Sequence, residues 1–231
     1  MSKFLELKRE VFEANMELDT RKLVTYTFGN VSQIDRAAGV VAIKPSGVPY
    51  EALKVEDIVV VDLENNIVEG KLNPSSDTKT HTYLYRTWDN IGGVTHTHST
   101  YATAWAQAQI DIPCLGTTQA DYVYGAIPCA PVMSNERIQG DYEEETGAQI
   151  VELFQDRDPN ESPMVIVAGH APFTWGKDAA KSVYHAVLLE EIAKMAYLTK
   201  TLSPQIGDLK QELVDKHYLR KNGKNAYYGQ K

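Results

Sequence analysis

The sequence contains little cysteine. Its 231 residues include only Cys114 and Cys129, which form no C-x-x-C pattern. A disulfide framework is not indicated, and the sequence favours two buried thiols in a reducing compartment. We therefore expect a cytoplasmic protein.

Long hydrophobic runs are also missing. The first residues, MSKFLELKRE, carry charges throughout and lack the apolar core of a signal peptide. Residues 90–110 hold no Asp, Glu, Lys or Arg, yet two histidines, several threonines and two glutamines make them too polar to span a bilayer. We expect neither a membrane span nor a secretion signal.

Positive charge is in deficit. The chain has 23 Lys and Arg against 31 Asp and Glu, a formal net charge of −8. Such a surface does not attract nucleic acid or an anionic membrane, because both carry negative charge themselves. A locally basic pocket for a small anion remains compatible with this balance.

The chain also lacks repeats, low-complexity tracts and Gly/Ser-rich linkers. Its 43% hydrophobic and 23% charged residues are typical of a globular protein. We therefore predict one domain over residues 1–231.

Periodicity predicts mixed secondary structure. Apolar positions Leu7, Val11, Ala14 and Leu18 recur at helical spacing, as do those within 150–154, 184–195 and 209–217. Runs typical of strands occupy 23–28, 40–43, 58–63, 93–98 and 164–168. Several early strands are joined by turns too short for a crossover helix, so part of the sheet must be antiparallel. Helices flanking such a sheet give a layered α/β or α+β domain.

The segment GGVTHTHS at 92–99 is the most informative one. Side chains alternate along a strand, so His96 and His98 are expected on one face, as half of a metal site. His170 follows a β-branched strand and is a candidate third ligand. The alternatives are two surface histidines on a polar strand and an ordinary core or loop histidine.

Two loops have the composition of an anion site. One is KPSG at 44–47, after a strand, and the other is NPSSD at 73–77, before an expected helix. Hydroxyl groups, free backbone N–H groups and a lysine suit a phosphate. The alternative for the second loop is a helix cap, with Ser75, Ser76 or Asp77 as the capping residue.

Two further features are candidates for chemistry. Asp121 is flanked by small and hydroxyl residues and could act as a general acid or base, although such an aspartate is also typical of a turn. The C-terminal segment, from His217 to the YYGQ motif at 227–230, concentrates aromatics and cations. It either docks into a site, such as one on a neighbouring subunit, or forms a disordered end.

Taken together, these motifs resemble the L-ribulose-5-phosphate 4-epimerases of the class II aldolase/adducin-head superfamily. The matching segments occur in family order along nearly the whole chain: GNVS at 29–32, IKPSG at 43–47, PSSDT at 74–78, GGVTHTHS at 92–99, GTTQADY at 116–122, HAPFTWGK at 170–177 and DKHYLRK at 215–221.

The resemblance implies a fold, a metal and a set of site residues. The fold is an α/β/α layered domain around a central, mostly antiparallel sheet. One Zn²⁺ per subunit is implied, although three histidines and a carboxylate also suit manganese or cobalt. The implied metal ligands are Asp77, His96, His98 and His170; the implied substrate-binding residues are Asn30, Lys44, Ser46, Gly47, Ser75, Ser76, His217 and Arg220; and the implied acid/base pair is Asp121 with Tyr228 of an adjacent subunit.

The resemblance also implies the reaction and the assembly. L-ribulose 5-phosphate and D-xylulose 5-phosphate would interconvert by cleavage and re-formation of the C3–C4 bond. The enzyme would be a homotetramer with active sites between subunits, into which about residues 205–231 reach. The first alternative is a class II sugar-phosphate aldolase similar to L-fuculose-phosphate aldolase, which typically has glutamate at the position of Asp77. The second is a non-catalytic scaffold similar to the adducin head.

Overall fold

A computed structural model describes residues 2–224 and 226–228 of the chain. The Gly229-Gln230 end of the C-terminal motif therefore lies outside the described residues. Within them, eight strands form one sheet in the order β4-β3-β2-β1-β5-β8-β7-β6. The strands are β1 (Asn30–Asp35), β2 (Val40–Ile43), β3 (Val59–Asp62), β4 (Ile67–Glu69), β5 (Gly93–His96), β6 (Cys129–Ala130), β7 (Met164–Val167) and β8 (Pro172–Gly176).

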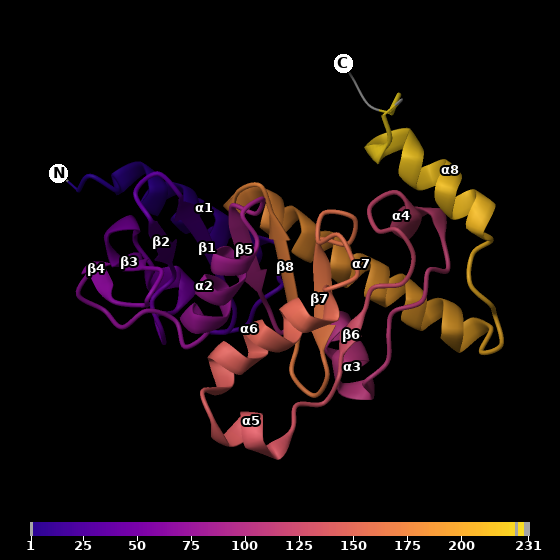
Figure 1. The fold of residues 1–231 in the computed structure, drawn as a ribbon, viewed down its shortest axis with the longest axis horizontal. Helices are drawn as coiled ribbons and strands as arrows, with labels where there is room; N and C mark the ends of the chain where they lie inside the picture. The colour runs from indigo at the N-terminus through magenta and orange to yellow at the C-terminus, as the bar shows by residue number, and fades with distance from the viewer. Residues whose placement is uncertain (1, 225, 229–231) are drawn as a thin grey trace.

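Helices cover both faces of this sheet (Figure 1). They are α1 (Leu5–Thr20), α2 (Thr78–Thr87), α3 (Thr100–Ala108), α4 (Thr117–Ala120), α5 (Asn135–Gln139), α6 (Tyr142–Leu153), α7 (Ala179–Leu202) and α8 (Gln211–Asn222), with two 3₁₀ turns at Tyr50–Ala52 and Val55–Asp57. All sheet pairings are antiparallel except that of β6 with β7. The predicted α/β/α layered domain with a mostly antiparallel sheet is confirmed.

Alternation along the strands divides the core between the two faces. Val41 of β2 and Val61 of β3 pack with α2 and α6, whereas Ala42 and Val60 pack with α1. The same division holds at the other end of the sheet, where Ile166 of β7 packs with α3 and α7. Because successive side chains point to opposite faces, these apolar strands are buried on both sides.

The predicted elements are mostly found, with three differences. The strand at 40–43 is β2 as predicted, but β5 ends at His96, two residues earlier than expected. The strand predicted at 23–28 is wrong: Tyr26 and Gly29 have φ of 55° and 75°, so the chain turns there and the strand starts at Asn30. Nothing in the pattern pointed to β1, β4, β6 or β8, or to the helices α3, α4 and α5.

The sheet topology brings distant loops together at one end of the central strands β1, β5 and β8. Asn30 at the start of β1 pairs with His96 at the end of β5, and His96 also pairs with Phe173 near the start of β8. The loop after β2 pairs with the loop before α2 through a bridge between Pro45 and Pro74. The candidate motifs therefore meet where these strands begin and end.

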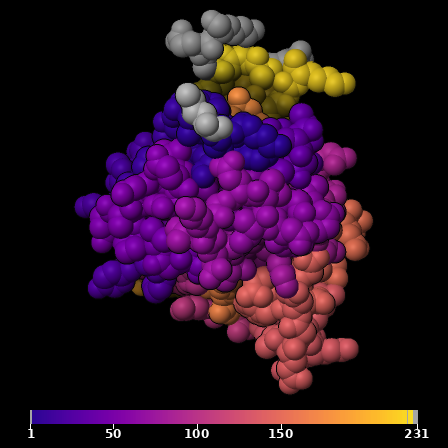
Figure 2. Space-filling view, turned by 90° about the vertical axis from the view of Figure 1, so that its left-hand side faces the viewer, coloured from indigo at the N-terminus to yellow at the C-terminus, as the bar shows by residue number. Residues whose placement is uncertain are grey.

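Helix α8 lies away from these strand ends. It packs on the short helix α4 at the periphery of the molecule, at the opposite end from β3 and β4 (Figure 1), and it projects at the top of the view in Figure 2. Its buried residues Val214 and Tyr218 face inward, while Leu213 and Leu219 are exposed. Over the described ranges, none of the helices combines the length and apolar character that crossing a bilayer requires.

Candidate metal and anion site

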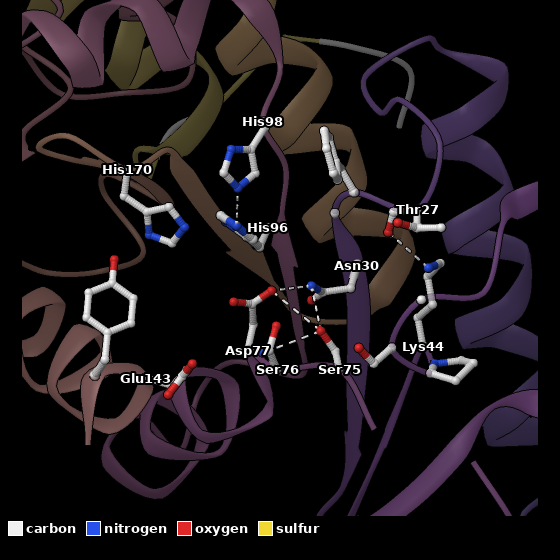
Figure 3. Close-up of a pocket in the computed structure, with 16 residues that line it drawn as sticks. Thr27, Asn30, Lys44, Ser75, Ser76, Asp77, His96, His98, Glu143 and His170 are labelled. Carbon is white, nitrogen blue, oxygen red and sulfur yellow. Dashed lines mark hydrogen bonds between the residues drawn. The ribbon is translucent and has the colours of Figure 1, made fainter. Parts of the chain in front are cut away.

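Three histidines converge at this end of the central strands. Each of His96, His98 and His170 offers a ring nitrogen, and these nitrogens all lie within 4.8 Å of one another. Figure 3 shows the three rings directed toward a common point. His96 ends β5, His98 lies two residues beyond it, and His170 lies in the tight turn between β7 and β8. The structure thus brings together the three histidines that the sequence singled out.

The tautomer of His96 is set by its surroundings. This residue is 2% exposed, and its Nδ1 lies 2.9 Å from the carbonyl oxygen of Pro172. A carbonyl only accepts, so the Nδ1 of His96 must carry a proton, and in the neutral ring the lone pair is on its Nε2. That lone pair lies 3.1 Å from the Nε2 of His98. A carbonyl behind a histidine is also the usual way in which proteins orient a metal-ligating imidazole.

The other two histidines are held in a form that suits a metal. Burial, followed by the charges of His96 and His98, lowers the pKa of His170 to about 3. Burial and the neighbouring His96 also lower the pKa of His98. The Nδ1 of His170 is buried and has no hydrogen-bond partner among the described residues. Neutral imidazoles with unused ring nitrogens are the form that binds a cation.

Asp77 contributes a carboxylate to the same pocket. It occupies the N-cap of α2, yet its side chain makes no capping hydrogen bond. Its Oδ2 instead accepts a hydrogen bond of 2.7 Å from Asn30, and Figure 3 shows it below the histidines. Burial alone would raise the pKa of Asp77, but the neighbouring His96 and His81 and the Asn30 hydrogen bond hold it below its ordinary value. The expectation of a helix start here is confirmed, but the side chain faces the pocket rather than the helix.

The donor set fits a divalent metal. Three imidazole nitrogens and one nearby carboxylate are the ligand types that zinc takes in proteins, and manganese and cobalt accept them too. The unused Nδ1 of His170 and the fixed lone pair of His96 are the structural observations that support this fit.

Lys44 lies in a second part of the pocket, which has the composition of an anion-binding site. Its side chain is only 1% exposed, although it is a cation. The ammonium donates to the carbonyl of Thr27 at 3.3 Å and lies 4.8 Å from the centre of the Tyr50 ring. Burial lowers the pKa of Lys44 to about 8, and no carboxylate of the described residues offsets that cost. A buried lysine without an acidic partner is the arrangement expected where an anion binds.

The histidine cluster and Lys44 line the same pocket. Its volume is about 470 Å³. Of the predicted site residues, the lining includes Asn30, Lys44, Ser46, Gly47, Ser75, Ser76, Asp77, His96, His98 and His170. Six other lining residues were not predicted as site residues. Gly29 and Pro45 fall inside the quoted motifs, and Thr27 and Phe28 lie just before the GNVS motif. No sequence signal pointed to Tyr142 and Glu143 at the start of α6.

The remaining predicted residues form a separate cluster. Asp121 is absent from the pocket lining, and its carboxylate accepts hydrogen bonds from Arg220 at 2.9 and 3.0 Å and from His217 at 3.0 Å. The ring of Tyr228 lies 5.0 Å from the Arg220 guanidinium. Burial would raise the pKa of Asp121, but the hydrogen bonds from Arg220 and His217 and the charge of Lys221 hold it low. The predicted division of the acid/base pair between two subunits stays a prediction, and within one chain Asp121 and the Tyr228 ring both contact Arg220 and Lys221.

Comparisons with known proteins give a family match and similar folds. Residues 9–197 match the family described as the Class II Aldolase and Adducin N-terminal domain. An L-fuculose 1-phosphate aldolase is 25% identical, with a TM-score of 0.77 over 94% of this chain and 95% of that chain.

Two more distant structures share the fold. The L-fuculose-1-phosphate aldolase of Thermus thermophilus is 22% identical, with a TM-score of 0.66 over 88% of this chain and 98% of that one. YgbL of Escherichia coli, described as a candidate aldolase, epimerase or decarboxylase, is 21% identical, with a TM-score of 0.73 over 93% and 99%.

Proposed function

Because the chain belongs to the class II aldolase and adducin N-terminal domain family, we propose that it is a metal-dependent sugar-phosphate enzyme, an L-ribulose-5-phosphate 4-epimerase. One observation carries the proposal: a three-histidine cluster shares a pocket with a buried lysine that has no acidic partner. A sugar phosphate offers both of the groups that such a pocket selects, oxygen ligands for a cation and a phosphate for a lysine.

Asp77, His96, His98 and His170 would hold one divalent metal ion per subunit, Zn²⁺ in the first instance. When bound, such an ion supplies Lewis-acid stabilisation of the negative charge that develops on the substrate oxygens. Asn30 fixes the Asp77 carboxylate through its 2.7 Å hydrogen bond, and it also donates to the Ser75 hydroxyl at 3.0 Å. Asn30 thus links the carboxylate to the anion part of the pocket.

Lys44 and the hydroxyls of Ser46, Ser75 and Ser76 would bind the phosphate. Gly47 has φ of +69°, which favours glycine and leaves the backbone of this loop open to a ligand. A phosphate held here anchors one end of the substrate. The fragment produced by cleavage then stays in the pocket, because the anchored end cannot diffuse away.

Asp121 and Tyr228 would move the protons. As the C3–C4 bond breaks, its electron pair moves into the C1–C3 fragment, which becomes an enediolate, and one of the two residues takes the proton of the C4 hydroxyl, which becomes an aldehyde. The aldehyde fragment turns to present its other face, the enediolate attacks it to form the C3–C4 bond again, and the other residue gives a proton to the C4 oxygen. The substrate gains or loses no proton or electron overall, and exchange with solvent restores the two residues. The configuration at C4 is inverted.

The separate Asp121 cluster would serve a neighbouring subunit. Asp121 lies outside the lining of the pocket in its own chain, so an Asp121 that acts on the substrate must reach the pocket of another subunit. We propose that one subunit brings this whole cluster to the pocket of the next subunit in a homotetramer: Tyr228, His217 and Arg220 from residues 205–231, together with Asp121 of the same chain. This differs from the division of Asp121 and Tyr228 between two subunits that the family resemblance implies. Closed symmetric oligomers repeat such a shared site once per subunit.

A class II aldolase acting on a related sugar phosphate is the second candidate, favoured by the 25% identity to an L-fuculose 1-phosphate aldolase. Asp77 is the feature that favours the epimerase, because its short carboxylate is already held by Asn30 and is suited to metal ligation rather than to proton transfer. A non-catalytic scaffold would not need the buried lysine or the histidine cluster.

Product analysis tests the proposal. Zinc-loaded protein is incubated separately with L-ribulose 5-phosphate and with L-fuculose 1-phosphate, and the sugar phosphates are followed by NMR. We expect D-xylulose 5-phosphate from the first, no turnover by metal-free protein, and at least a 100-fold loss of turnover in Asp121→Asn. Cleavage of L-fuculose 1-phosphate alone would replace the epimerase by the aldolase. If the protein binds no divalent metal and turns over neither substrate, only the scaffold is left.

A further inference from the structure

A lysine that the proposed chemistry does not use lies at the centre of the Asp121 cluster. Lys221 is the last-turn neighbour of Arg220 on α8, and its side chain is 13% exposed. Its ammonium lies 3.7 Å from the Oδ2 of Asp121. The same ammonium lies 3.8 Å from the centre of the Tyr122 ring and 4.3 Å from that of Tyr228. One cation therefore contacts a carboxylate and two aromatic rings.

The backbone brings Tyr228 back onto α8. The carbonyl oxygen of Arg220 accepts hydrogen bonds from the N–H groups of Tyr227 at 2.9 Å and Tyr228 at 3.1 Å. These bonds fix the direction of the chain after the helix, but they leave the side chain of Tyr228 free to rotate. Tyr228 is 59% exposed, so little apolar packing holds its ring. The contacts with Arg220 and Lys221 are the ones that do.

Arg220 is already committed to another partner. Its Nε and Nη2 donate to both carboxylate oxygens of Asp121, in the two-pronged geometry that arginine forms with carboxylates. Lys221 makes no two-pronged contact of this kind, because its ammonium is a single point charge, 3.7 Å from the carboxylate of Asp121. It lies closer to the Tyr228 ring than the Arg220 guanidinium does, 4.3 Å against 5.0 Å.

We propose that Lys221 is a positioning residue that holds the Tyr228 ring beside Asp121, so that the two form one preassembled unit on a single subunit. The assignment of Asp121 and Tyr228 as acid and base rests on the proposed function. Cation–π attraction to both rings and the charge of Asp121 together restrict where the ammonium can lie. A general acid that is already held in its reactive position acts faster than one on a mobile side chain, which must first rotate into that position.

Other titratable or charged groups face this unit from the helices packed around it. From α8 they are His217 and Arg220, and from α7 they are Tyr184 and Lys181. The Tyr184 hydroxyl donates to that of Tyr122 at 2.7 Å, and the Lys181 ammonium lies 4.0 Å from the Tyr184 ring. Lys221 contributes to the low pKa of Asp121, after the hydrogen bonds from Arg220 and His217. Removal of the Lys221 charge should therefore raise that pKa, while the three hydrogen bonds from Arg220 and His217 remain.

The test compares Lys221→Met and Lys221→Arg in the full-length, metal-loaded protein. Lys216→Met is the matched control, because Lys216 lies on the same helix with its ammonium 5.7 Å from the ring of Tyr227 instead. For Lys221→Met we expect a loss in kcat of roughly tenfold or more, smaller than the 10²–10⁴-fold effect of removing a general acid altogether. KM for the sugar phosphate should not change. The acidic limb of the pH–rate profile should move to higher pH, and Lys221→Arg should restore both values.

NMR gives a readout that does not need activity. With carboxyl-labelled aspartate and ring-labelled tyrosine, Asp121 and Tyr228 are identified by the signals lost in Asp121→Asn and Tyr228→Phe. In Lys221→Met the Asp121 carboxyl should titrate at higher pH, and the Tyr228 ring signals should move toward those of an unstructured tyrosine. Lys216→Met should leave both unchanged.

The outcomes separate this inference from the proposed function. If Lys221→Met leaves the Asp121 titration, the Tyr228 signals and kcat as they are, Lys221 does not position the pair. A rise in KM at unchanged kcat would make Lys221 a substrate ligand and would also overturn the inference. If the wild type turns over no sugar phosphate, the proposed function fails. The NMR shifts then still decide whether Lys221 holds Tyr228 beside Asp121.

Discussion

At the scale of single residues, two side chains adopt states that a bound ligand would stabilise. Lys44 is a buried cation without an acidic partner, and Asp77 sits at a helix N-terminus without capping it. Each state has a cost of its own, about 1 kcal/mol for a missing cap and several for a desolvated ion. Both costs are offset if a cation and an anion bind in the pocket that the two residues line.

Removal of the Lys44 charge should weaken phosphate binding without affecting the metal. We expect Lys44→Met to raise KM for the sugar phosphate by tenfold or more, because a charged hydrogen bond to phosphate contributes about 1.5–3 kcal/mol. The affinity for zinc should stay within twofold of the wild type, measured by competition with a chelator. Lys71→Met, at an exposed lysine, is the control. An unchanged KM would remove Lys44 from the phosphate site.

The same residue gives the wild type a pH dependence of definite sign. The pKa of Lys44 is lowered to about 8, so the ammonium form that binds phosphate is present below pH 8 and is lost as the pH rises through that value. We therefore expect kcat/KM to fall above pH 8, by up to about tenfold per pH unit. Lys44→Met should lack this basic limb.

At the scale of elements, the packing of α6 on α2 sets one wall of the pocket. Tyr142 and Glu143 at the start of α6 line the pocket, and Asp77 directly precedes α2. The two helices approach closely at Gly147, where an added Cβ would lie 2.7 Å from the Cβ of Tyr83. A glycine inside a helix weakens it by roughly 1 kcal/mol relative to alanine, so a close approach is the reason to have one here.

Gly147→Ala should therefore destabilise the protein despite the better helix propensity of alanine. Overpacking costs typically 1–3 kcal/mol, so we expect a net loss of about 1–2 kcal/mol in the free energy of unfolding. Denaturant titration measures it, and KM should rise because α6 must move. Gly207→Ala, where nothing lies within 4 Å of the new Cβ, should leave both unchanged. Equal stability of the two variants would show that α2 and α6 tolerate wider spacing.

At the scale of the whole molecule, the metal-type pocket and the Asp121 cluster are separate parts of one chain. The pocket lies where β1, β5 and β8 begin and end, whereas the cluster joins α4 and α8 at the periphery (Figure 1). If each pocket is completed by the cluster of a neighbouring subunit, two inactive variants can repair one another.

We expect activity when His98→Asn and Asp121→Asn subunits are unfolded and refolded together. The Asp121→Asn subunit supplies an intact pocket and the His98→Asn subunit an intact cluster, so chance pairing should give about a quarter of the wild-type activity. Asp121→Asn mixed with Tyr228→Phe is the control. It should stay inactive, because both changes damage the same cluster. No recovery in mixed oligomers of the first pair would place each complete site within one chain.

Local sequence predicted the long helices and the buried strands β2, β3, β5 and β7, but it missed most of the short elements. The helix at Leu7, Val11, Ala14 and Leu18 is α1, because its apolar spacing matches the face that it buries. The strand predicted at 23–28 failed, since left-handed backbone conformations at Tyr26 and Gly29 override the β-branched composition. Short strands such as β6, with two residues, are stabilised by their neighbours and leave too few residues for a pattern.

The sequence by itself determined the chemistry of this protein: which imidazoles, carboxylates, hydroxyls and lysine are available, and in which motifs. Only the tertiary structure decided which of them meet. Antiparallel pairing of β1 with β5 and of β5 with β8 sets Asn30, His96 and the His170 turn side by side. It also left Asp121 with α8, outside the pocket of its own chain. Spacing along the chain cannot give these contacts, because strand order and register are fixed by the burial of both sheet faces together.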